Sequence, residues 1–246
     1  MCTVSWLREP AGYQVFFNRD ERATRAPGLP PQVGDLNGVR WLAPRDGDQL
    51  GTWIGANELG VTLGLLNRFE ESPARSTGGG FRSRGLLVTS LLDLGDLDGL
   101  ERRLHESDLS IYQPFTLTSF APGEAARLFA WNGSRLSRQD RAHSALVLTS
   151  SGYDQAEATR IRGALFEEAQ AEGGSAAEAF EALHRSHFPE RGPFSICMHR
   201  EEAATVSFTR VAVRPGSVEM TYVPGPPGET PESTVARLDR QAPYSQ

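Results

Sequence analysis

The sequence contains no lysine, and all 25 of its basic residues are arginine. This absence excludes a P-loop, whose lysine contacts a nucleotide phosphate, and enzymes that form a Schiff base through lysine. A GC-rich coding bias explains the absence more simply than selection for arginine chemistry. With 31 acidic residues the formal net charge is −6, and no segment concentrates arginine without acidic neighbours. We therefore expect no general binding of nucleic acid.

Cysteine is almost as scarce, with only Cys2 and Cys197 in 246 residues. Two cysteines do not make a disulfide framework, so a reducing, cytoplasmic location is expected. The sequence has no run of eighteen apolar residues, and its first residues lack the basic start and apolar stretch of a secretory signal. We therefore expect neither a membrane span nor secretion.

The predicted elements come in the order strands, helices, strands, helices, strands. Because strands and helices do not alternate one by one, this order favours two sheets covered by helices over a parallel α/β sheet. Residues 1–223 are expected to form one domain, and the proline-rich residues 224–246 a loosely held tail. The predicted strands are 2–7, 13–18, 39–42, 52–57, 60–67, several within 115–150, then 194–200, 204–212 and 217–223. The predicted helices are 83–94, 96–106, 154–171 and 175–187, the last two opened by capping boxes.

The first two predicted strands form a hairpin with a five-residue turn, Arg8 to Gly12. A symmetric turn pairs Leu7 with Tyr13 and places Cys2 opposite Asn18. Directly opposed residues lie about 5 Å apart at Cβ, so this register puts Asn18 beside the thiol.

Cys2 is the first candidate for chemistry. Cysteine is small enough for the initiator methionine to be removed ahead of it, which leaves a free α-amine on the residue that bears the thiol. That amine has a pKa near 8, so one residue can supply both nucleophile and base. The alternative is a small buried side chain at the start of a strand.

Four polar residues, Asn18, Arg19, Asp20 and Glu21, end the strand paired with Cys2. The arginine could bind a substrate carboxylate or stabilise a thiolate, and Asp20 could orient the α-ammonium group. A solvated turn explains the same four residues equally well.

Asn67 ends an apolar strand, where an amide is unexpected. Its NH₂ group could stabilise the oxyanion of a tetrahedral intermediate. Asn57, in the Gly55-x-Asn57-Glu58-x-Gly60 motif, is assigned more readily to a turn. The glycine-rich stretch before Arg82 and Arg84 is either an anion-binding loop or a flexible connector.

No metal site is expected. His184 and His187 lie three residues apart near a helix end, which a partly exposed helix terminus explains. Cys197 and His199 share one face of a predicted strand and could bind a soft metal, but no second ligand pair accompanies them. A buried core cysteine is therefore the preferred interpretation of Cys197.

Together the Met-Cys-Thr start, the NRDE tetrapeptide at 18–21, the GANELG turn at 55–60 and Ser83-Arg84-Gly85 resemble the NRDE family. This is the family of transport and Golgi organisation protein 2. The layout is also similar to cysteine N-terminal-nucleophile hydrolases such as penicillin V acylase and bile salt hydrolase. The resemblance covers about residues 1–90 well. It implies an α+β fold of N-terminal-nucleophile type, a four-layer αββα sandwich with two mainly antiparallel sheets between helical layers.

The resemblance has two departures. Those hydrolases have arginine where this chain has Asn18, and here the arginine comes one place later, at Arg19. They also carry a Thr-Asn pair near mid-chain, whereas residues 148–151 lack the asparagine. Since adjacent strand residues point to opposite faces, the shifted arginine bears directly on function.

The resemblance implies a small-molecule pocket centred on Cys2. In one hypothesis Cys2 hydrolyses a small acyl amide, Asn67 and a backbone N–H stabilise the oxyanion, and Arg19 or Asn18 positions the substrate, with Asp20 in the catalytic group. Glu21, Asn57, Arg82 and Arg84 are the expected substrate contacts, and no cofactor is required. The alternatives are a haem or acyl-CoA and lipid binding protein without turnover, and a scaffold with a vestigial pocket. The oligomeric state is left open.

Overall fold

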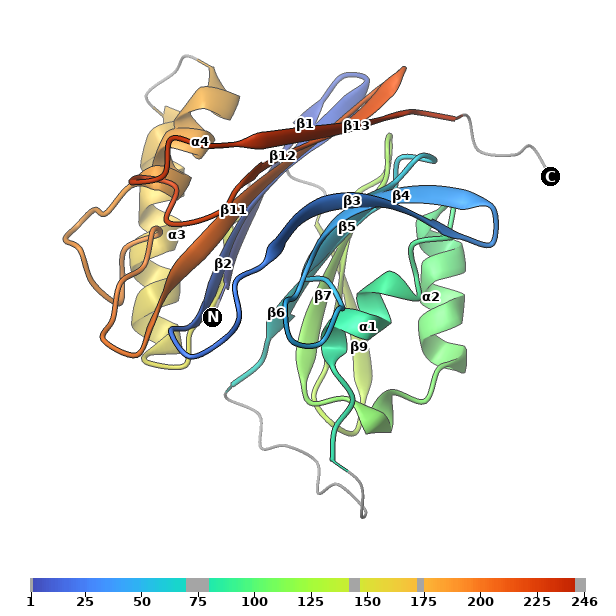
Figure 1. The fold of residues 1–246 in the computed structure, drawn as a ribbon, viewed down its shortest axis with the longest axis horizontal. Coiled ribbons are helices and arrows are strands. Elements are labelled where there is room, and N and C mark those ends of the chain that lie inside the picture. Colours follow the sequence, from blue (N-terminus) through green and yellow to red (C-terminus); the bar gives the residue numbers. More distant parts are fainter. Residues whose placement is uncertain (1, 70–79, 142–146, 172–174, 242–246) are drawn as a thin grey trace.

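The computed structural model describes residues 2–69, 80–141, 147–171 and 175–241 (Figure 1). These residues form two antiparallel sheets. One sheet has the order β10-β1-β2-β11-β12-β13 and the other β3-β4-β5-β6-β7-β8-β9. The six-stranded sheet contains β1 (Cys2–Glu9), β2 (Gly12–Arg22), β10 (Val147–Ser150), β11 (Ala203–Arg214), β12 (Ser217–Val223) and β13 (Thr234–Asp239). The seven-stranded sheet contains β3 (Leu29–Leu36), β4 (Val39–Arg45), β5 (Ile54–Asn57), β6 (Thr62–Asn67), β7 (Phe115–Phe120), β8 (Ala126–Trp131) and β9 (Leu136–Arg141).

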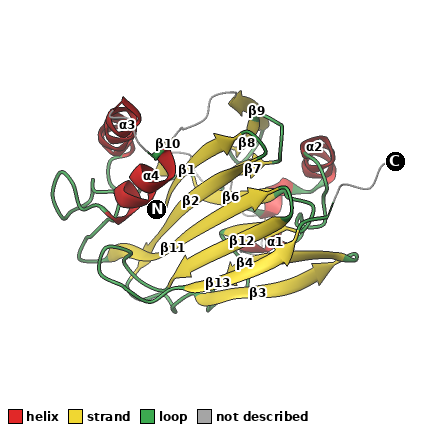
Figure 2. Cartoon of the chain, turned by 90° about the horizontal axis from the view of Figure 1, so that it is seen from above, coloured by secondary structure: helices red, strands yellow, loops and turns green. Residues whose placement is uncertain are grey.

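Helices cover the outer face of each sheet (Figures 1 and 2). The helices α3 (Gln155–Ala171) and α4 (Ala176–Arg185) lie on the six-stranded sheet. The helices α1 (Arg84–Thr89) and α2 (Leu97–Glu106), followed by a short 3₁₀ turn at Leu109–Ile111, lie on the seven-stranded sheet. No helix among the described residues is long and apolar enough to cross a lipid bilayer. The predicted α+β class and αββα sandwich are confirmed.

Strand alternation divides the apolar side chains between the layers. Val4 and Trp6 of β1 and Phe17 of β2 pack between the two sheets, where Trp6 lies 5.2 Å from the ring centroid of Phe120. Phe16 faces the other way and packs under α3 and α4. Because successive residues of a strand point to opposite faces, β1 and β2 present one set of side chains to the sheet interface and another to the helices.

Side-chain caps begin α2, α3 and α4, and those of α3 and α4 were predicted from the sequence. The carboxylate of Asp96 accepts a hydrogen bond from the backbone N–H of Gly99 at 2.6 Å, and Asp154 accepts one from Glu157 at 3.0 Å. The hydroxyl of Ser175 accepts from Glu178 at 3.5 Å. Each of these side chains satisfies a backbone donor that has no partner within the helix.

The predicted register of the first hairpin is wrong by one residue. Glu9 pairs with Gly12, so the turn contains only Pro10 and Ala11, and Cys2 lies opposite Arg19 rather than Asn18. Gly12 also lets β11 approach β2 closely, because a Cβ at this position would lie 1.9 Å from the carbonyl oxygen of Val213 on β11. A one-residue shift in register exchanges the faces of a strand, so Arg19, not Asn18, shares a face with Cys2.

Three other segments differ from the prediction. Residues 29–36 form a strand despite Pro30 and Pro31, because β3 is an edge strand, where missing backbone donors cost little. Residues 194–200 do not form a strand. The helix expected at 83–94 ends at Thr89, and the chain after it forms turns.

The chain after residue 223 was expected to be a loose tail, but residues 234–239 form β13, which pairs with β12 along its whole length. Leu238 is only 4% exposed and belongs to the core between the sheets. The sheet therefore extends past the predicted domain boundary, and only residues 242–246 of the predicted tail lie outside the described residues.

We predict that Leu238→Ala lowers the free energy of unfolding by about 2–4 kcal/mol, because it leaves a cavity in this core. Val235→Ala, on the same strand but 62% exposed, should change it by less than about 0.5 kcal/mol. Urea denaturation measures both. Equal, small effects of the two substitutions would mean that β13 is dispensable.

Candidate functional site

Cys2 lies at the edge of a cavity of about 700 Å³ between the two sheets. The six-stranded sheet contributes Cys2, Arg19 and Asp20, and the seven-stranded sheet contributes Asn67. The volume falls in the range of small-molecule sites, about 300–1,000 Å³. The cavity therefore combines a thiol, carboxylates and guanidinium groups in a space that suits a small organic ligand.

Arg19 is fixed beside Cys2 by two interactions. Its Nη2 lies 2.5 Å from Oδ2 of Asp46, and its guanidinium group lies 4.2 Å above the ring of Trp53. Arg25 contacts the other oxygen of Asp46 at 2.9 Å. The other guanidinium nitrogen of Arg19, Nη1, is buried and has no hydrogen-bond partner among the described residues. Arg19 thus has an unused donor near Gly28, where an added Cβ would lie 3.3 Å from Nη1.

The sequence analysis did not find Asp46, Arg25 or Trp53, which lie in or beside a segment expected to be mostly loop. Desolvation raises the pKa of the Asp46 carboxyl, but its contacts with Arg25 and Arg19 and with the backbone N–H of Gln49 outweigh it and lower the pKa overall. No local motif marks this residue. Only the packing of the two sheets brings Asp46, which follows β4, to Arg19 on β2.

Asp20 contacts Cys2 with its backbone, whose N–H donates a hydrogen bond to the Cys2 sulfur. Its carboxylate accepts a hydrogen bond from the hydroxyl of Thr205 at 2.6 Å. Burial raises the pKa of Cys2 above its usual range, and burial also raises the pKa of Asp20, with Arg162 opposing the second shift. The resting residue is therefore a thiol that needs a base before it can attack.

Arg162 is a further residue that was not predicted from the sequence. It is fully buried beneath β1, and its Nη1 donates hydrogen bonds to the hydroxyls of Thr3 and Thr149, each at 2.6 Å. Its Nη2 donates to the carbonyl of Ser195 at 2.9 Å. The signal was present in α3, because positions 158, 162 and 166 form its buried face and an arginine stands among apolar residues there.

Asn18 does not reach the cavity. Its NH₂ group donates hydrogen bonds to the carbonyls of His184 at 2.9 Å and Ile196 at 3.0 Å, and its oxygen contacts Nδ1 of His184 at 3.0 Å. Because Asn18 Oδ1 can only accept, His184 Nδ1 carries the proton, and Nε2 accepts from the hydroxyl of Ser5 at 2.8 Å. Asn18 and His184 thus form a buried structural network on the helix side of the sheet, and the predicted catalytic placement of Asn18 is not supported.

Of the remaining predicted site residues, four line the cavity and one, Asn57, does not. Glu21, Asn67, Arg82 and Arg84 line the cavity with Cys2. Asn57 is not among the described residues that do so. Its NH₂ group donates to the carbonyls of Leu92 and Leu94, and its oxygen accepts from the N–H of Val61, so it anchors the turn after β5 to the α1–α2 connection. That placement agrees with its interpretation as a turn residue.

A sequence-family model described as Transport and Golgi organisation 2 matches residues 1–213. The chain belongs to this family. No curated protein is significantly similar to it in sequence.

Solved structures show which fold this Transport and Golgi organisation 2 family member has. Penicillin V acylase from Agrobacterium tumefaciens is similar with a TM-score of 0.59 and 11% identity, over 97% of this chain and 86% of that chain. A mutant of conjugated bile acid hydrolase from Clostridium perfringens is similar with a TM-score of 0.55 and 13% identity, over 97% and 92%. The fold is that of N-terminal-nucleophile hydrolases.

The buried network at His184 makes stability depend on pH. Burial lowers the pKa of His184 to about 3, well below the value of about 6.5 expected in the unfolded chain. As the pH falls, the unfolded state therefore binds a proton on this histidine before the folded state does. The contribution of neutral His184 to the free energy of unfolding is complete above about pH 6.5 and is lost as the pH falls toward 3. By pH 5 the loss from this group should be about 2 kcal/mol.

We predict that His184→Gln reduces the fall in unfolding free energy between pH 7 and pH 5 by about 2 kcal/mol. Denaturant titrations at both pH values measure this difference. The matched control is His105→Gln, at an exposed position on α2, which should leave the pH dependence unchanged. An identical pH dependence in all three proteins would show that His184 is not buried in a neutral form.

Proposed function

We propose that Cys2 is the nucleophile of an amidohydrolase that cleaves small acyl amides carrying an anionic group. The observation that carries this proposal is the pairing of Cys2 with Arg19 at the edge of a 700 Å³ cavity. The same fold occurs in penicillin V acylase and conjugated bile acid hydrolase, which supports a hydrolytic reaction at this place.

The reaction requires removal of Met1. The freed α-amine of Cys2, with a pKa near 8, takes the thiol proton as the sulfur attacks the amide carbonyl. The C–N bond then breaks, the α-ammonium returns the proton to the leaving amine, and a thioester remains on Cys2. Water hydrolyses the thioester, which releases the carboxylic acid and regenerates the thiol.

Other cavity residues have roles in this proposal. Asn67, with a backbone N–H, would stabilise the oxyanion, and Asp20 would orient the α-amine. Arg84 suits an anionic part of the substrate, because its Nη1 donates a hydrogen bond at 2.8 Å to the carbonyl of Pro114, a neutral partner, and it interacts electrostatically with Cys2. Its positive charge is thus presented toward the thiol.

An electrophilic lactam probe tests this function, with intact-mass analysis of protein expressed without an N-terminal tag. We predict one adduct on the chain lacking Met1, absent in Cys2→Ala and retained in Cys197→Ala. Arg84→Met should slow labelling by an anionic probe about 10–100-fold, because a hydrogen bond to a charged group is lost. Labelling by a neutral probe should be nearly unchanged. An adduct that persists in Cys2→Ala would exclude Cys2 as the nucleophile.

A second function, binding of an anionic ligand without turnover, is favoured by the charge of the cavity. Six arginines and four acidic residues line it, a surplus of two positive charges. The arginines are Arg19, Arg22, Arg25, Arg82, Arg84 and Arg200, and the acidic residues are Asp20, Glu21, Asp46 and Glu202. Haem and acyl-CoA are the two candidate ligands. The raised pKa of Cys2 disfavours the thiolate that haem iron would require, so a phosphate-bearing ligand such as acyl-CoA fits better.

Titration calorimetry with CoA and with haem separates these ligands. We predict that CoA binds, that affinity falls with added salt, and that Arg82→Met weakens it about tenfold while Cys2→Ser leaves it unchanged. The matched control is Arg160→Met, whose side chain is 68% exposed on α3. If haem binds instead, with a thiolate spectrum that Cys2→Ala abolishes, the CoA assignment fails.

A further inference from the structure

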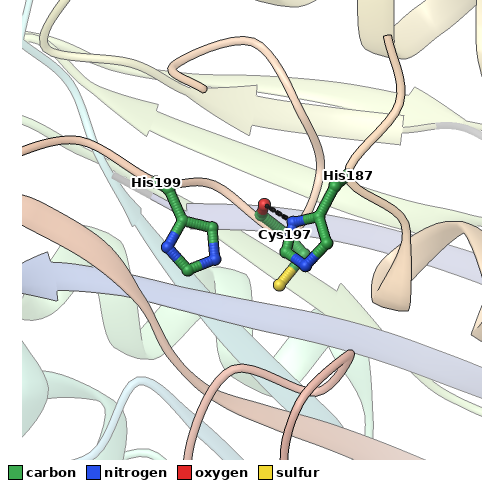
Figure 3. A group of neighbouring side chains, drawn as sticks. All are labelled: His187, Cys197 and His199. Atoms are coloured by element: carbon green, nitrogen blue, oxygen red, sulfur yellow. Dashed lines mark hydrogen bonds between the residues drawn. The ribbon is translucent and has the colours of Figure 1, made fainter. Parts of the chain in front are cut away.

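A second group of reactive side chains lies outside the Cys2 cavity. His187 follows α4, and Cys197 and His199 lie in the irregular segment before β11. One ligand atom from each of the three residues lies within 4.8 Å of the others. Figure 3 shows that the Cys197 sulfur and the Nε2 atoms of both histidines point toward a common space. The prediction that Cys197 is buried is confirmed, but the predicted strand that was to carry it is absent.

A fourth donor comes from the connection between β12 and β13. Oε1 of Glu229 lies 3.6 Å from Nε2 of His187 and 3.5 Å from Nε2 of His199. Ligands placed tetrahedrally at about 2.0–2.3 Å from zinc lie about 3.3–3.8 Å from one another. The carboxylate is already at that spacing from both imidazoles. The ligand atoms of His187, Cys197 and His199 lie within 4.8 Å of one another and need to approach by about 1 Å.

Neighbouring hydrogen bonds orient His187 and Cys197 so that their ligand atoms face the shared space. Nδ1 of His187 contacts the carbonyl oxygen of Cys197 at 3.0 Å, so Nδ1 carries the proton and Nε2 keeps its lone pair. Outer hydrogen bonds of this kind fix the orientation of metal-binding imidazoles. The backbone N–H of Gly228 donates to the Cys197 sulfur. The Nε2 atom of His199 is buried and has no hydrogen-bond partner among the described residues, which leaves an unsatisfied group aimed at the same space.

We propose that His187, Cys197, His199 and Glu229 form a binding site for a zinc-class divalent cation. Imidazole nitrogen, thiolate and carboxylate are all ligand types that bind zinc in proteins, and four of them suit its tetrahedral coordination. The cation would replace the proton of the Cys197 thiol, which is released to solvent. With all four positions taken by protein, the site is structural rather than catalytic.

Arg191 competes with the cation. Its Nη1 lies 2.7 Å from the same Glu229 oxygen, and its Nη2 lies 3.3 Å from Nδ1 of His199. A histidine that binds metal through Nε2 carries its proton on Nδ1, so Arg191 must move away from His199 on binding. Its side chain is 57% exposed, so this movement breaks no core packing. Arg191→Ala should therefore strengthen metal binding.

The site would tie together three segments that no strand pairing joins. Cys197 follows Ile196, whose carbonyl accepts a hydrogen bond from Asn18 on β2. The backbone N–H of Cys197 donates to Ser186 O at 3.0 Å, next to His187. A cation here would fix the irregular segment that supports the helix side of the six-stranded sheet. None of the four proposed ligands is among the described residues that line the Cys2 cavity.

Cobalt(II) titration tests the site, because a thiolate ligand gives a charge-transfer band in the near ultraviolet. The chain has only two cysteines, so Cys2→Ser is the matched control for Cys197→Ser. We expect one equivalent of cobalt to produce the band in wild type and Cys2→Ser, zinc to displace it, and Cys197→Ser to abolish it. A band that is lost only in Cys2→Ser, or no band in wild type, would overturn the proposal.

Competition of zinc with a chromophoric chelator then measures the contribution of each ligand. Loss of an outer hydrogen bond costs about 10–100-fold in metal affinity, so His187→Ala and His199→Ala should each cost at least about 100-fold. His105→Ala, at the exposed position on α2, should have no effect. Glu229→Gln should weaken binding while retaining the cobalt band. Unchanged affinity in Glu229→Gln would remove Glu229 from the site, and unchanged affinity in either histidine variant would overturn the site itself.

Discussion

Because Glu9 pairs with Gly12 across a two-residue turn, Cys2 and Arg19 share the face of the six-stranded sheet that looks toward the second sheet. The same register turns Thr3, Ser5 and Asn18 toward the helices, where Arg162 and His184 bind them. A slip of one residue would place Asn18 beside the thiol and bury Arg19 under α3 and α4. The division between a reactive face and a structural face thus depends on one hairpin.

Each face carries a buried arginine, and the two are stabilised differently. Arg19 has a carboxylate, Asp46, and the ring of Trp53. Arg162 is held by hydroxyls and main-chain carbonyls, with Asp20 acting through space. Burying a charge costs several kcal/mol unless its donors are satisfied, so both arginines require the strands around them to hold exact positions. Of the nitrogens of these two guanidinium groups, only Arg19 Nη1 is buried without a hydrogen-bond partner among the described residues, and it lies near Gly28.

Local signals predicted much of the fold and part of the site. Alternation predicted the strands, capping residues predicted the starts of α3 and α4, and short motifs identified Cys2, Arg19, Asp20 and Asn67. The pairing partner of Cys2 was missed because turn length cannot be read from composition when Pro10 and Gly12 both favour a turn. Asp46 and Arg162 were missed because their roles arise from contacts 27 and 159 residues away in sequence. Asp46 left no local trace, whereas the helical periodicity of α3 marks Arg162 as buried without revealing its partners.

Asp20 connects the cavity with the proposed cation site. Burial raises the pKa of Cys2 and of Cys197 and lowers the pKa of His199, and the negative charge of Asp20 adds a smaller upward effect on each. Burial raises the pKa of Asp20 itself, whereas Arg162 favours its ionised form. A cation held by Cys197 and His199 would act in the same direction as Arg162, because opposite charges stabilise one another more strongly in a buried setting.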